Sequence, residues 1–191
     1  MKAIRFKIIS IVRNTKDTYT YVLKPVDDLY VPYEAGQFIT LLLDINGREL
    51  RRSYSFSSTP GIDENMSITI KEVVNGEVSR YLLRNLDVGS EVRALPPAGK
   101  FVLNTSPENQ RTVFFIAAGS GITPIYSIIK KLLRTEPLSN IILIDQNRNE
   151  ASTIFYNELK ALENEFPKQL KNIFLFSNPG NAEPQRLQQE L

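Results

Sequence analysis

Cysteine and histidine are both absent from this chain of 191 residues, and so is tryptophan. Without cysteine, the chain holds no disulfide framework, no thiolate zinc site and no cysteine-bound iron–sulfur cluster. Without histidine, Ser-His-Asp and Cys-His catalytic groups and imidazole metal sites are excluded as well. We therefore expect no metal site within these residues, and we expect any chemistry to come from a bound organic cofactor.

A charge excess of one sign and long apolar runs are also lacking. The 23 basic and 21 acidic residues leave a formal net charge of +2, which does not favour nucleic acid or an anionic membrane as a partner. No apolar run approaches the roughly 20 residues that cross a bilayer, and the first residues lead into a strand pattern rather than a signal peptide. We expect a cytoplasmic protein with no membrane span and no nucleic-acid partner.

The first half of the chain has the pattern of short β-strands. Six segments rich in Ile, Val, Tyr and Phe are separated by turn residues such as Asn46-Gly47 and Asn75-Gly76. They cover residues 7–12, 19–24, 38–43, 51–56, 67–73 and 91–95, with one helix expected over 78–86. Six short strands with hairpin turns predict an antiparallel six-stranded β-barrel in a domain of residues 1–103.

The second half has a different pattern after the polar segment 104–111. Continuous apolar strands over 112–118, 140–144 and 171–176 alternate with helices over 124–134 and 153–166, and a further helix is expected over 183–191. This alternation predicts an α/β domain of residues 112–191 with a parallel sheet. Because a dinucleotide-binding fold normally has more than three strands, we expect this domain to be incomplete, with further residues after 191.

The segment Arg51-Arg52-Ser53-Tyr54-Ser55 carries the first candidate site. On a strand, alternate residues share a face, so Arg52 and Tyr54 lie on one face while Ser53 and Ser55 lie on the other. A guanidinium beside an aromatic ring suits a planar ligand with an anionic tail. Taken alone, the same residues also fit an edge strand with solvated arginines and a half-buried tyrosine.

Two glycine-containing turns precede predicted helices. Gly76 leads into Glu77-Val78-Ser79 at the start of the helix over 78–86, where unpaired backbone N–H groups bind anions. Gly119-Ser120-Gly121 joins a buried strand to the helix over 124–134, with Thr123 as the expected cap and Pro124 in the first turn. The first turn also fits an ordinary hairpin, and the second lacks the full G-x-G-x-x-G pattern.

Taken in order, four motifs resemble the ferredoxin–NADP reductase superfamily. They are RSYS (52–55), IKEVVNGEVS (70–79), PPAGKF (96–101) and AAGSGITP (117–124). Within this superfamily, the chain is most similar to the bacterial oxygenase-reductase and phenylacetate-degradation reductase branch. Four motifs in one order are more specific than any one of them. The resemblance implies an FAD-binding barrel followed by a domain that binds NADPH or NADH.

The resemblance also implies a role for each motif residue. Arg52 would bind the FAD diphosphate, and Tyr54 and Ser55, at the flavin ring and near its N5, are the candidate catalytic residues. Ser53 belongs to the same cofactor-binding strand. The remaining cofactor-binding candidates are Ile70 and Lys71 at the pyrimidine edge of the flavin, Gly76, Val78 and Ser79 at the diphosphate, and Gly119, Gly121, Thr123 and Pro124 at the nicotinamide nucleotide.

The preference between NADH and NADPH stays open. Arg148 matches a family Asn-Arg pair and could contact a ribose phosphate, although it also fits a solvated loop arginine. Asp145, about twenty residues after the glycines, is the residue type that a free ribose 2′-hydroxyl prefers. After the third parallel strand, Ser177 is followed by Asn178 where relatives often have an arginine that contacts the 2′-phosphate.

The activity implied is hydride transfer from NAD(P)H to FAD, followed by release of single electrons to an iron–sulfur acceptor such as a [2Fe–2S] protein, or a domain fused after residue 191. The chain lacks the Cys-Gly-Pro motif and terminal aromatic residue of relatives. One alternative is therefore a flavin- or nucleotide-binding regulatory or electron-relay subunit that does not oxidise NAD(P)H. A second is a siderophore-iron reductase, which the nearly neutral charge disfavours.

Overall fold

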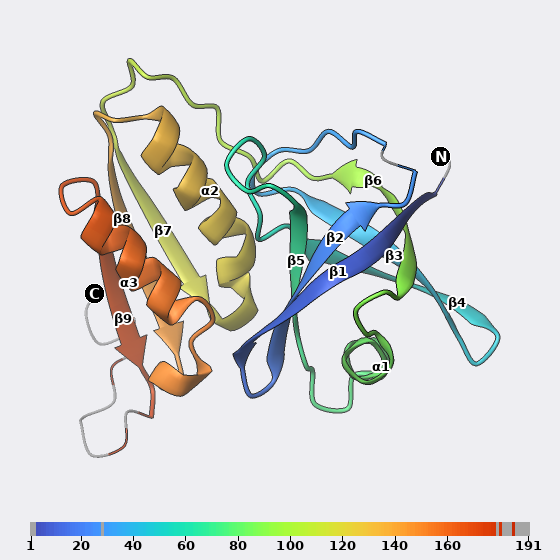
Figure 1. Cartoon of the computed structure of the whole chain (residues 1–191). Coiled ribbons are helices and arrows are strands. Elements are labelled where there is room, and N and C mark those ends of the chain that lie inside the picture. The colour runs from blue at the N-terminus through green and yellow to red at the C-terminus, as the bar shows by residue number, and fades with distance from the viewer. Residues whose placement is uncertain (1–2, 28, 179, 181–184, 186–191) are drawn as a thin grey trace. The chain divides into compact units, whose positions relative to one another are not determined.

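The computed structural model describes residues 3–27, 29–178, 180 and 185, and it divides the chain into two units, Met1–Leu103 and Asn104–Leu191. The first unit contains one antiparallel sheet and the second contains one parallel sheet (Figure 1). The change from period-two alternation to continuous apolar strands in the sequence therefore corresponds to a real change of architecture.

Six strands form the sheet of the first unit in the order β4-β3-β6-β1-β2-β5. They are β1 (Ile4–Thr15), β2 (Thr18–Pro25), β3 (Phe38–Ile45), β4 (Arg48–Ser55), β5 (Met66–Lys71) and β6 (Glu91–Ala98). All neighbours are antiparallel, and an isolated bridge from Phe56 to Ile68 joins the two outer strands. This bridge closes the sheet into a barrel, which confirms the predicted six-stranded fold.

The barrel interior is filled by the inward-facing residues of every strand. Phe6, Ile39, Phe56 and Ile68 are almost completely buried there, because alternate residues of each strand point to the same side. Helix α1 (Glu77–Asn85) packs Leu82 and Val78 into the same core. The start of this helix is thereby held at one place on the barrel.

Three parallel strands and two helices make up the second unit (Figure 1). The strands β7 (Thr112–Ala118), β8 (Asn140–Asn147) and β9 (Leu170–Phe176) lie in that order, with helices α2 (Ile122–Thr135) and α3 (Tyr156–Glu165) between them. The sheet face with Phe115 and Leu143 is buried, whereas Phe114 is 65% and Ile116 62% exposed on the opposite face. The two helices therefore cover one face of the sheet.

The predicted helices differ from the observed ones at their ends. Of the segment predicted as a helix over 153–166, the first three residues are not helical: a 3₁₀ turn, Glu150–Ser152, precedes them, and α3 starts at Tyr156. Asn149 and Ser152 form a reciprocal capping box, and Phe155 has a left-handed backbone (φ 62°), so one continuous helix is interrupted. The helix predicted over 183–191 lies outside the described residues, apart from Gln185.

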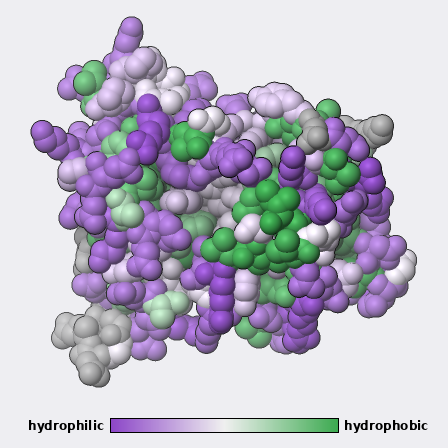
Figure 2. Space-filling view, in the orientation of Figure 1, coloured by the Kyte–Doolittle hydropathy of each residue, from purple (hydrophilic) through white to green (hydrophobic). Residues whose placement is uncertain are grey.

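Polar side chains cover most of the face shown in Figure 2. An apolar patch lies over β1 and β2 of the barrel unit, where Ile9 and Val12 are among the exposed large hydrophobic residues.

Candidate functional site

The strand β4 places Arg52 and Tyr54 on one face, as the alternation in the sequence predicts. Arg52 is paired with Leu41 and Tyr54 with Ile39, and both partners point into the barrel core. Ser53 is paired with Thr40, and their hydroxyl oxygens are 2.9 Å apart. The guanidinium and the phenol ring are thus neighbours on the inner side of an outer strand.

The Arg52 guanidinium is exposed and has no acidic partner among the described residues. Its Nη1 donates only to the carbonyl oxygen of Arg51, 2.7 Å away. Neighbouring arginines differ, because Arg48 forms an ion pair with Glu77 (2.9 Å) and Arg51 one with Glu49 (2.9 Å). Arg52 is therefore available to an external anion, which a planar guanidinium binds with two parallel hydrogen bonds.

The ring of Tyr54 is half-buried against the barrel core. Burial raises the pKa of Tyr54 to about 12, against an opposing effect of the Arg52 charge. The phenol therefore stays protonated at all physiological pH values and presents a neutral aromatic surface. Ser55, which is also half-buried, follows it at the end of β4.

The outer strand β5, which the Phe56–Ile68 bridge joins to the residue after β4, carries Ile70 and Lys71 near its end. Ile70 is fully buried, with its backbone as well as its side chain inaccessible in this structure. The Lys71 ammonium lies 3.9 Å from Asp17, and the amide of Glu72 donates to the Asp17 carbonyl oxygen at 2.7 Å. These contacts hold the end of β5 at the barrel edge.

The turn before α1 is tightly built around Gly76. A β-carbon at Gly76 would lie 2.8 Å from the Ser79 hydroxyl oxygen and 2.9 Å from the Val73 β-carbon, so only glycine fits. The Ser79 hydroxyl is buried and accepts a hydrogen bond from the amide of Val73 at 3.0 Å, while Val78 packs into the core. Ser79 therefore braces the turn.

The start of α1 and strand β4 belong to the same region of the barrel. The ion pair between Arg48 and Glu77 joins them directly. An open pocket of about 360 Å³ lies beside them and is lined by residues of the β3–β4 turn and of α1, including Asn46, Gly76 and Arg80. A cation, an aromatic ring and a helix start with unpaired N–H groups are thus combined on one unit.

The glycine turn of the second unit connects β7 to α2. Gly119 has a positive φ of 54°, which favours glycine, and a β-carbon added at Gly119 or Gly121 would meet nothing within 4 Å. The turn lies beside the end of β8. It therefore leaves open space next to the backbone at the carboxyl end of a parallel sheet, the usual place for ligands in such folds.

Thr123 is not the cap of α2, contrary to the sequence prediction. The helix begins at Ile122, its N-cap is Gly121, and no side chain caps it. Thr123 lies inside the first turn with its hydroxyl oxygen buried and without a hydrogen-bond partner. The 3₁₀ turn Gly119–Gly121 continues directly into the helix, so the helix starts two residues earlier than Pro124.

The residues proposed to contact the ribose lie at the end of β8. Arg148 is exposed just after the strand. Asp145 is completely buried on the face covered by the helices, so its carboxylate has no exposed surface to offer a ribose hydroxyl. This burial argues against the NADH preference that its position in the sequence favours.

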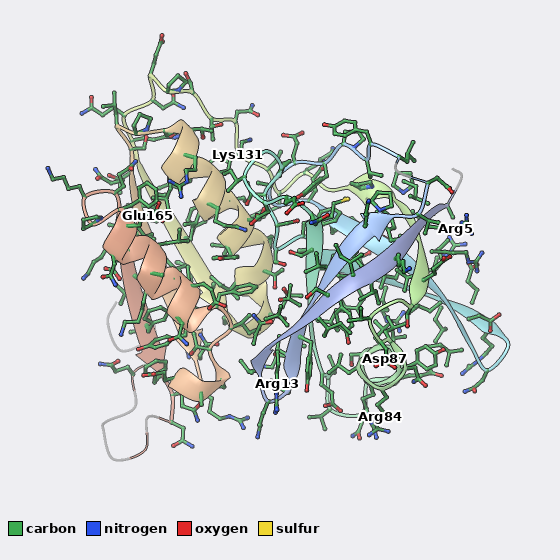
Figure 3. All side chains as sticks on the ribbon, viewed as in Figure 1. Arg5, Arg13, Arg84, Asp87, Lys131 and Glu165 are labelled. Atoms are coloured by element: carbon green, nitrogen blue, oxygen red, sulfur yellow. The ribbon has the colours of Figure 1, made fainter. Side chains whose placement is uncertain are left out.

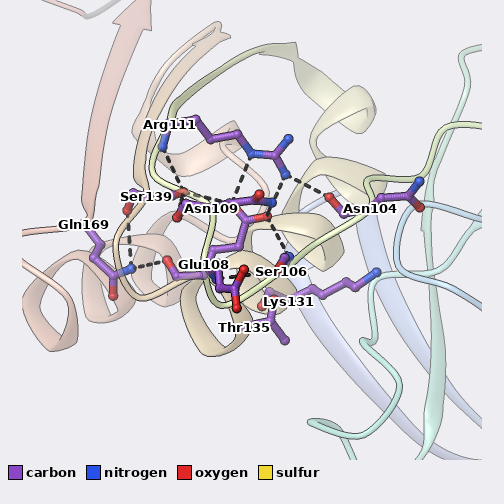
Figure 4. Close-up of polar contacts among 10 residues, drawn as sticks. Asn104, Ser106, Glu108, Asn109, Arg111, Lys131, Thr135, Ser139 and Gln169 are labelled. Atoms are coloured by element: carbon purple, nitrogen blue, oxygen red, sulfur yellow. Dashed lines mark hydrogen bonds and ion pairs between the residues drawn. The ribbon is translucent and has the colours of Figure 1, made fainter.

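Sequence reasoning missed a polar cluster around Glu136 (Figure 4). Arg111 donates to its carboxylate through Nη2 at 2.6 Å and Nε at 3.1 Å, and Asn109 and Ser139 donate at 2.7 and 2.8 Å. Burial alone would raise the pKa of Glu136, but these hydrogen bonds and one from the Ser106 amide lower it to about 2. The cluster fixes segment 104–111 onto the end of α2.

Within the described part of the chain, no group of three or more acidic side chains is suited to hold a metal ion. In that same part, none of the helices combines the length and apolar character that crossing a membrane requires.

Two family models match the chain. An oxidoreductase FAD-binding domain matches residues 5–103, and an oxidoreductase NAD-binding domain matches residues 115–190. The chain therefore belongs to the ferredoxin–NADP reductase family of flavin oxidoreductases, with an FAD-binding barrel followed by an NAD-binding α/β domain.

Two similar proteins are components of an epoxidase and of a monooxygenase. A component of the 1,2-phenylacetyl-CoA epoxidase of Escherichia coli (strain K12) is 34% identical over 89% of this chain and 48% of the relative. The ferredoxin reductase component of the 3-ketosteroid-9-alpha-monooxygenase of Rhodococcus rhodochrous is 35% identical over 88% and 48%. The chain thus spans about half the length of these relatives. A ferredoxin-NADP+ reductase structure from Plasmodium falciparum has a TM-score of 0.82 at 23% identity, covering 95% of this chain and 76% of that one.

The glycine turn offers a direct test of close ligand approach. Gly121→Ala adds a methyl group into open space, so we expect the melting temperature to change little. If a dinucleotide lies against this backbone, we expect about tenfold weaker NAD(P)H binding, because the methyl group takes the ligand's place. Isothermal titration with NADH and NADPH measures this. Ser120→Ala, in the same turn, adds no volume and serves as the control; equal affinities for all three proteins would count against the assignment.

Proposed function

We propose that this chain is the flavin- and nicotinamide-binding part of an NAD(P)H-dependent oxidoreductase. It takes a hydride from NADPH or NADH onto FAD and passes electrons singly to an iron–sulfur acceptor, such as a [2Fe–2S] protein or domain. The relatives named as reductase components of monooxygenases support this acceptor class. We further propose domain limits of 1–103 and 112–191 and a cytoplasmic location.

The observation that carries the proposal is the pairing of Arg52 with Tyr54. An exposed guanidinium without a carboxylate partner among the described residues lies on the same face of β4 as a half-buried, neutral aromatic ring. The ring offers a surface for the planar isoalloxazine, and the guanidinium offers two hydrogen bonds to the diphosphate. On the same strand, Arg48 and Arg51 are instead paired with Glu77 and Glu49.

The other barrel candidates fit an FAD molecule whose flavin ring lies on Tyr54 and whose diphosphate lies at Arg52. The backbone at Gly76 and the unpaired N–H groups at the start of α1 would hold the diphosphate, and the crowding around Gly76 explains why no side chain occupies this turn. The Ser79 hydroxyl accepts a hydrogen bond from the Val73 amide and would still donate its own proton to the diphosphate. Backbone groups of Ile70 and Lys71 would border the flavin, with Ser53 on the outer face of β4.

When bound, FAD accepts an electron pair from the nicotinamide and releases single electrons. The task of the protein is then to align two rings and exclude water, which requires neither histidine nor cysteine. Tyr54 orients the flavin plane, and the Ser55 hydroxyl would donate a hydrogen bond near N5. Gly119 and Gly121 leave open space beside the backbone, where the nicotinamide nucleotide would lie, with Pro124 and the buried Thr123 following in the chain. Arg148 would face its ribose phosphate.

A spectroscopic experiment tests the proposal. The purified protein, supplied with FAD, is expected to show the absorption bands of oxidised protein-bound flavin, and anaerobic NADH or NADPH is expected to bleach them. The faster donor identifies the preferred nucleotide. Bound flavin that neither donor bleaches would support the alternative of a regulatory or electron-relay protein. A protein that binds no added FAD would contradict both.

A further inference from the structure

Two carboxylates of the second unit are completely buried, and their surroundings are opposite. Glu136 receives hydrogen bonds from Arg111, Asn109 and Ser139. Asp145 is equally buried, yet neither of its oxygens has a partner in hydrogen-bonding geometry among the described residues, and the polar side chain close to it is that of Asn147. An ionised carboxylate without partners is very unfavourable in a protein interior, so the two side chains must differ in protonation.

Asp145 lies at the carboxyl end of β8, next to the glycine turn. It pairs with Ala117 of β7, two residues before Gly119, and the end of β8 contacts the turn Gly119–Gly121. Two more buried polar atoms without partners in the described structure belong to this end of the unit. They are the Thr123 hydroxyl oxygen at the start of α2 and the Asn147 side-chain nitrogen, two residues along the same face of β8.

The charged side chains of α2 and α3 nearest to Asp145 contact other residues. On the covered face of the sheet, the neighbours of Asp145 are Ala117 and Phe174, which are uncharged. The buried side of α2 carries Lys130, about two turns beyond Thr123, where its ammonium lies 4.6 Å from the Tyr126 ring centroid. On α3, Glu163 reaches Asn172 and Lys171 instead.

Burial is the main influence on this side chain, and it raises the pKa of Asp145 to about 7, with a smaller opposing effect from Asn147. The ordinary aspartate pKa is 3.8. The folded protein therefore keeps a proton here at pH values where the unfolded chain has lost it. The contribution of Asp145 to the free energy of unfolding falls as the pH rises from about 4 towards 7, and this contribution no longer changes above that range.

We propose that Asp145 is a proton-dependent positioning residue for the nucleotide-binding turn. As the neutral acid, it can stay buried without a cationic partner, and the turn Gly119–Gly121 then lies against the end of β8 as observed. As the carboxylate, it needs water or a cation, and the end of β8 and the turn Gly119–Gly121 separate to admit one.

A consequence for ligand binding rests on the proposed function. An ionised Asp145 adds a negative charge behind the turn that would hold a dinucleotide diphosphate, and it loosens that turn. NAD(P)H binding is therefore expected to weaken by about three- to tenfold between pH 6 and pH 8.5. By linkage, bound nucleotide raises the pH at which Asp145 loses its proton.

The proton itself can be observed without any ligand. Infrared spectra of the full chain at about pH 6 are expected to contain the C=O stretch of a protonated buried carboxyl, which disappears at high pH and is absent from Asp145→Asn. Glu136 contributes no such band, because it is ionised. In parallel, hydrogen exchange at residues 119–123, corrected for the intrinsic rate, is expected to accelerate with pH in the wild type and to stay flat in Asp145→Asn. Asp87→Asn, on the exposed surface of the barrel (Figure 3), is the control.

The outcomes separate the two proposals. Absence of the carboxyl band at pH 6, or exchange that does not respond to pH, overturns the role of Asp145 whether or not a nucleotide binds. A band and an exchange response that both vanish in Asp145→Asn support that role even if NADH does not bind at any pH, a result that contradicts the proposed function alone. NADH affinity that is constant from pH 6 to pH 8.5 despite a titrating band overturns the link to binding.

Discussion

Arg52→Ala is expected to weaken FAD binding by about ten- to hundredfold while leaving the barrel folded. The guanidinium would make charge-assisted hydrogen bonds to the diphosphate, each stronger than a neutral one, and loss of about 1.5–3 kcal/mol corresponds to that range of affinity. The fold is expected to persist because the side chain is exposed and its one hydrogen bond goes to the neighbouring carbonyl of Arg51. Fluorescence titration of the apoprotein with FAD measures the change.

Arg51→Ala is the matched control for this effect. The adjacent side chain lies on the opposite face of β4 and forms an ion pair with Glu49 at the surface. Its loss is expected to change FAD affinity by less than about twofold, because exposed ion pairs contribute about 0–1 kcal/mol and this one is remote from the ligand face. If Arg51→Ala and Arg52→Ala weakened FAD equally, general basicity rather than the proposed contact would explain both.

Arg111→Ala is expected to destabilise the second unit by about 3 kcal/mol. The change leaves the fully buried Glu136 carboxylate without its guanidinium, and breaking a buried pair typically costs about 3–5 kcal/mol. The value lies at the lower end because Arg111 is partly exposed and Asn109 and Ser139 still donate to the carboxylate. Urea unfolding measures the loss in the free energy of unfolding, and native-state hydrogen exchange in α2 and β9 shows that the loss lies in the second unit.

Arg134→Ala provides the comparison at the surface. Its ion pair with Glu165 is 2.8 Å long, but both side chains are about half-exposed, so we expect a loss of about 0–1 kcal/mol. The pH dependence of stability adds a second test of the buried pair between Arg111 and Glu136. The pKa of Glu136 is held near 2, below its ordinary 4.5. The contribution of Glu136 to stability is therefore complete above about pH 4.5 and disappears as the pH falls towards 2. Arg111→Ala should flatten this acid-side loss; equal stability of both arginine variants would contradict the buried-pair argument.

Local patterns in the sequence were sufficient for much of the fold. The run 112–118 and strand β7 agree residue for residue, because a continuous apolar segment ended by glycine has few alternatives. The alternation around Arg52 and Tyr54 likewise predicted their shared face. The prediction was wrong where the preceding backbone determines the start of a helix. At Thr123, the 3₁₀ turn Gly119–Gly121 leads into α2, and the threonine is not its cap.

The sequence by itself determined the two kinds of sheet, the candidate ligand face of β4 and the positions of both glycine turns, because these depend on periodicity and on residue types within a few positions. Only the tertiary structure decided which charged groups are buried and with what partners. Glu136 and Asp145 are both acidic residues near the end of an element, yet among the described residues Glu136 meets four donors and an arginine charge, whereas Asp145 has only the Asn147 side chain nearby. That difference arises from segments up to 30 residues apart in the chain, which local sequence cannot bring together.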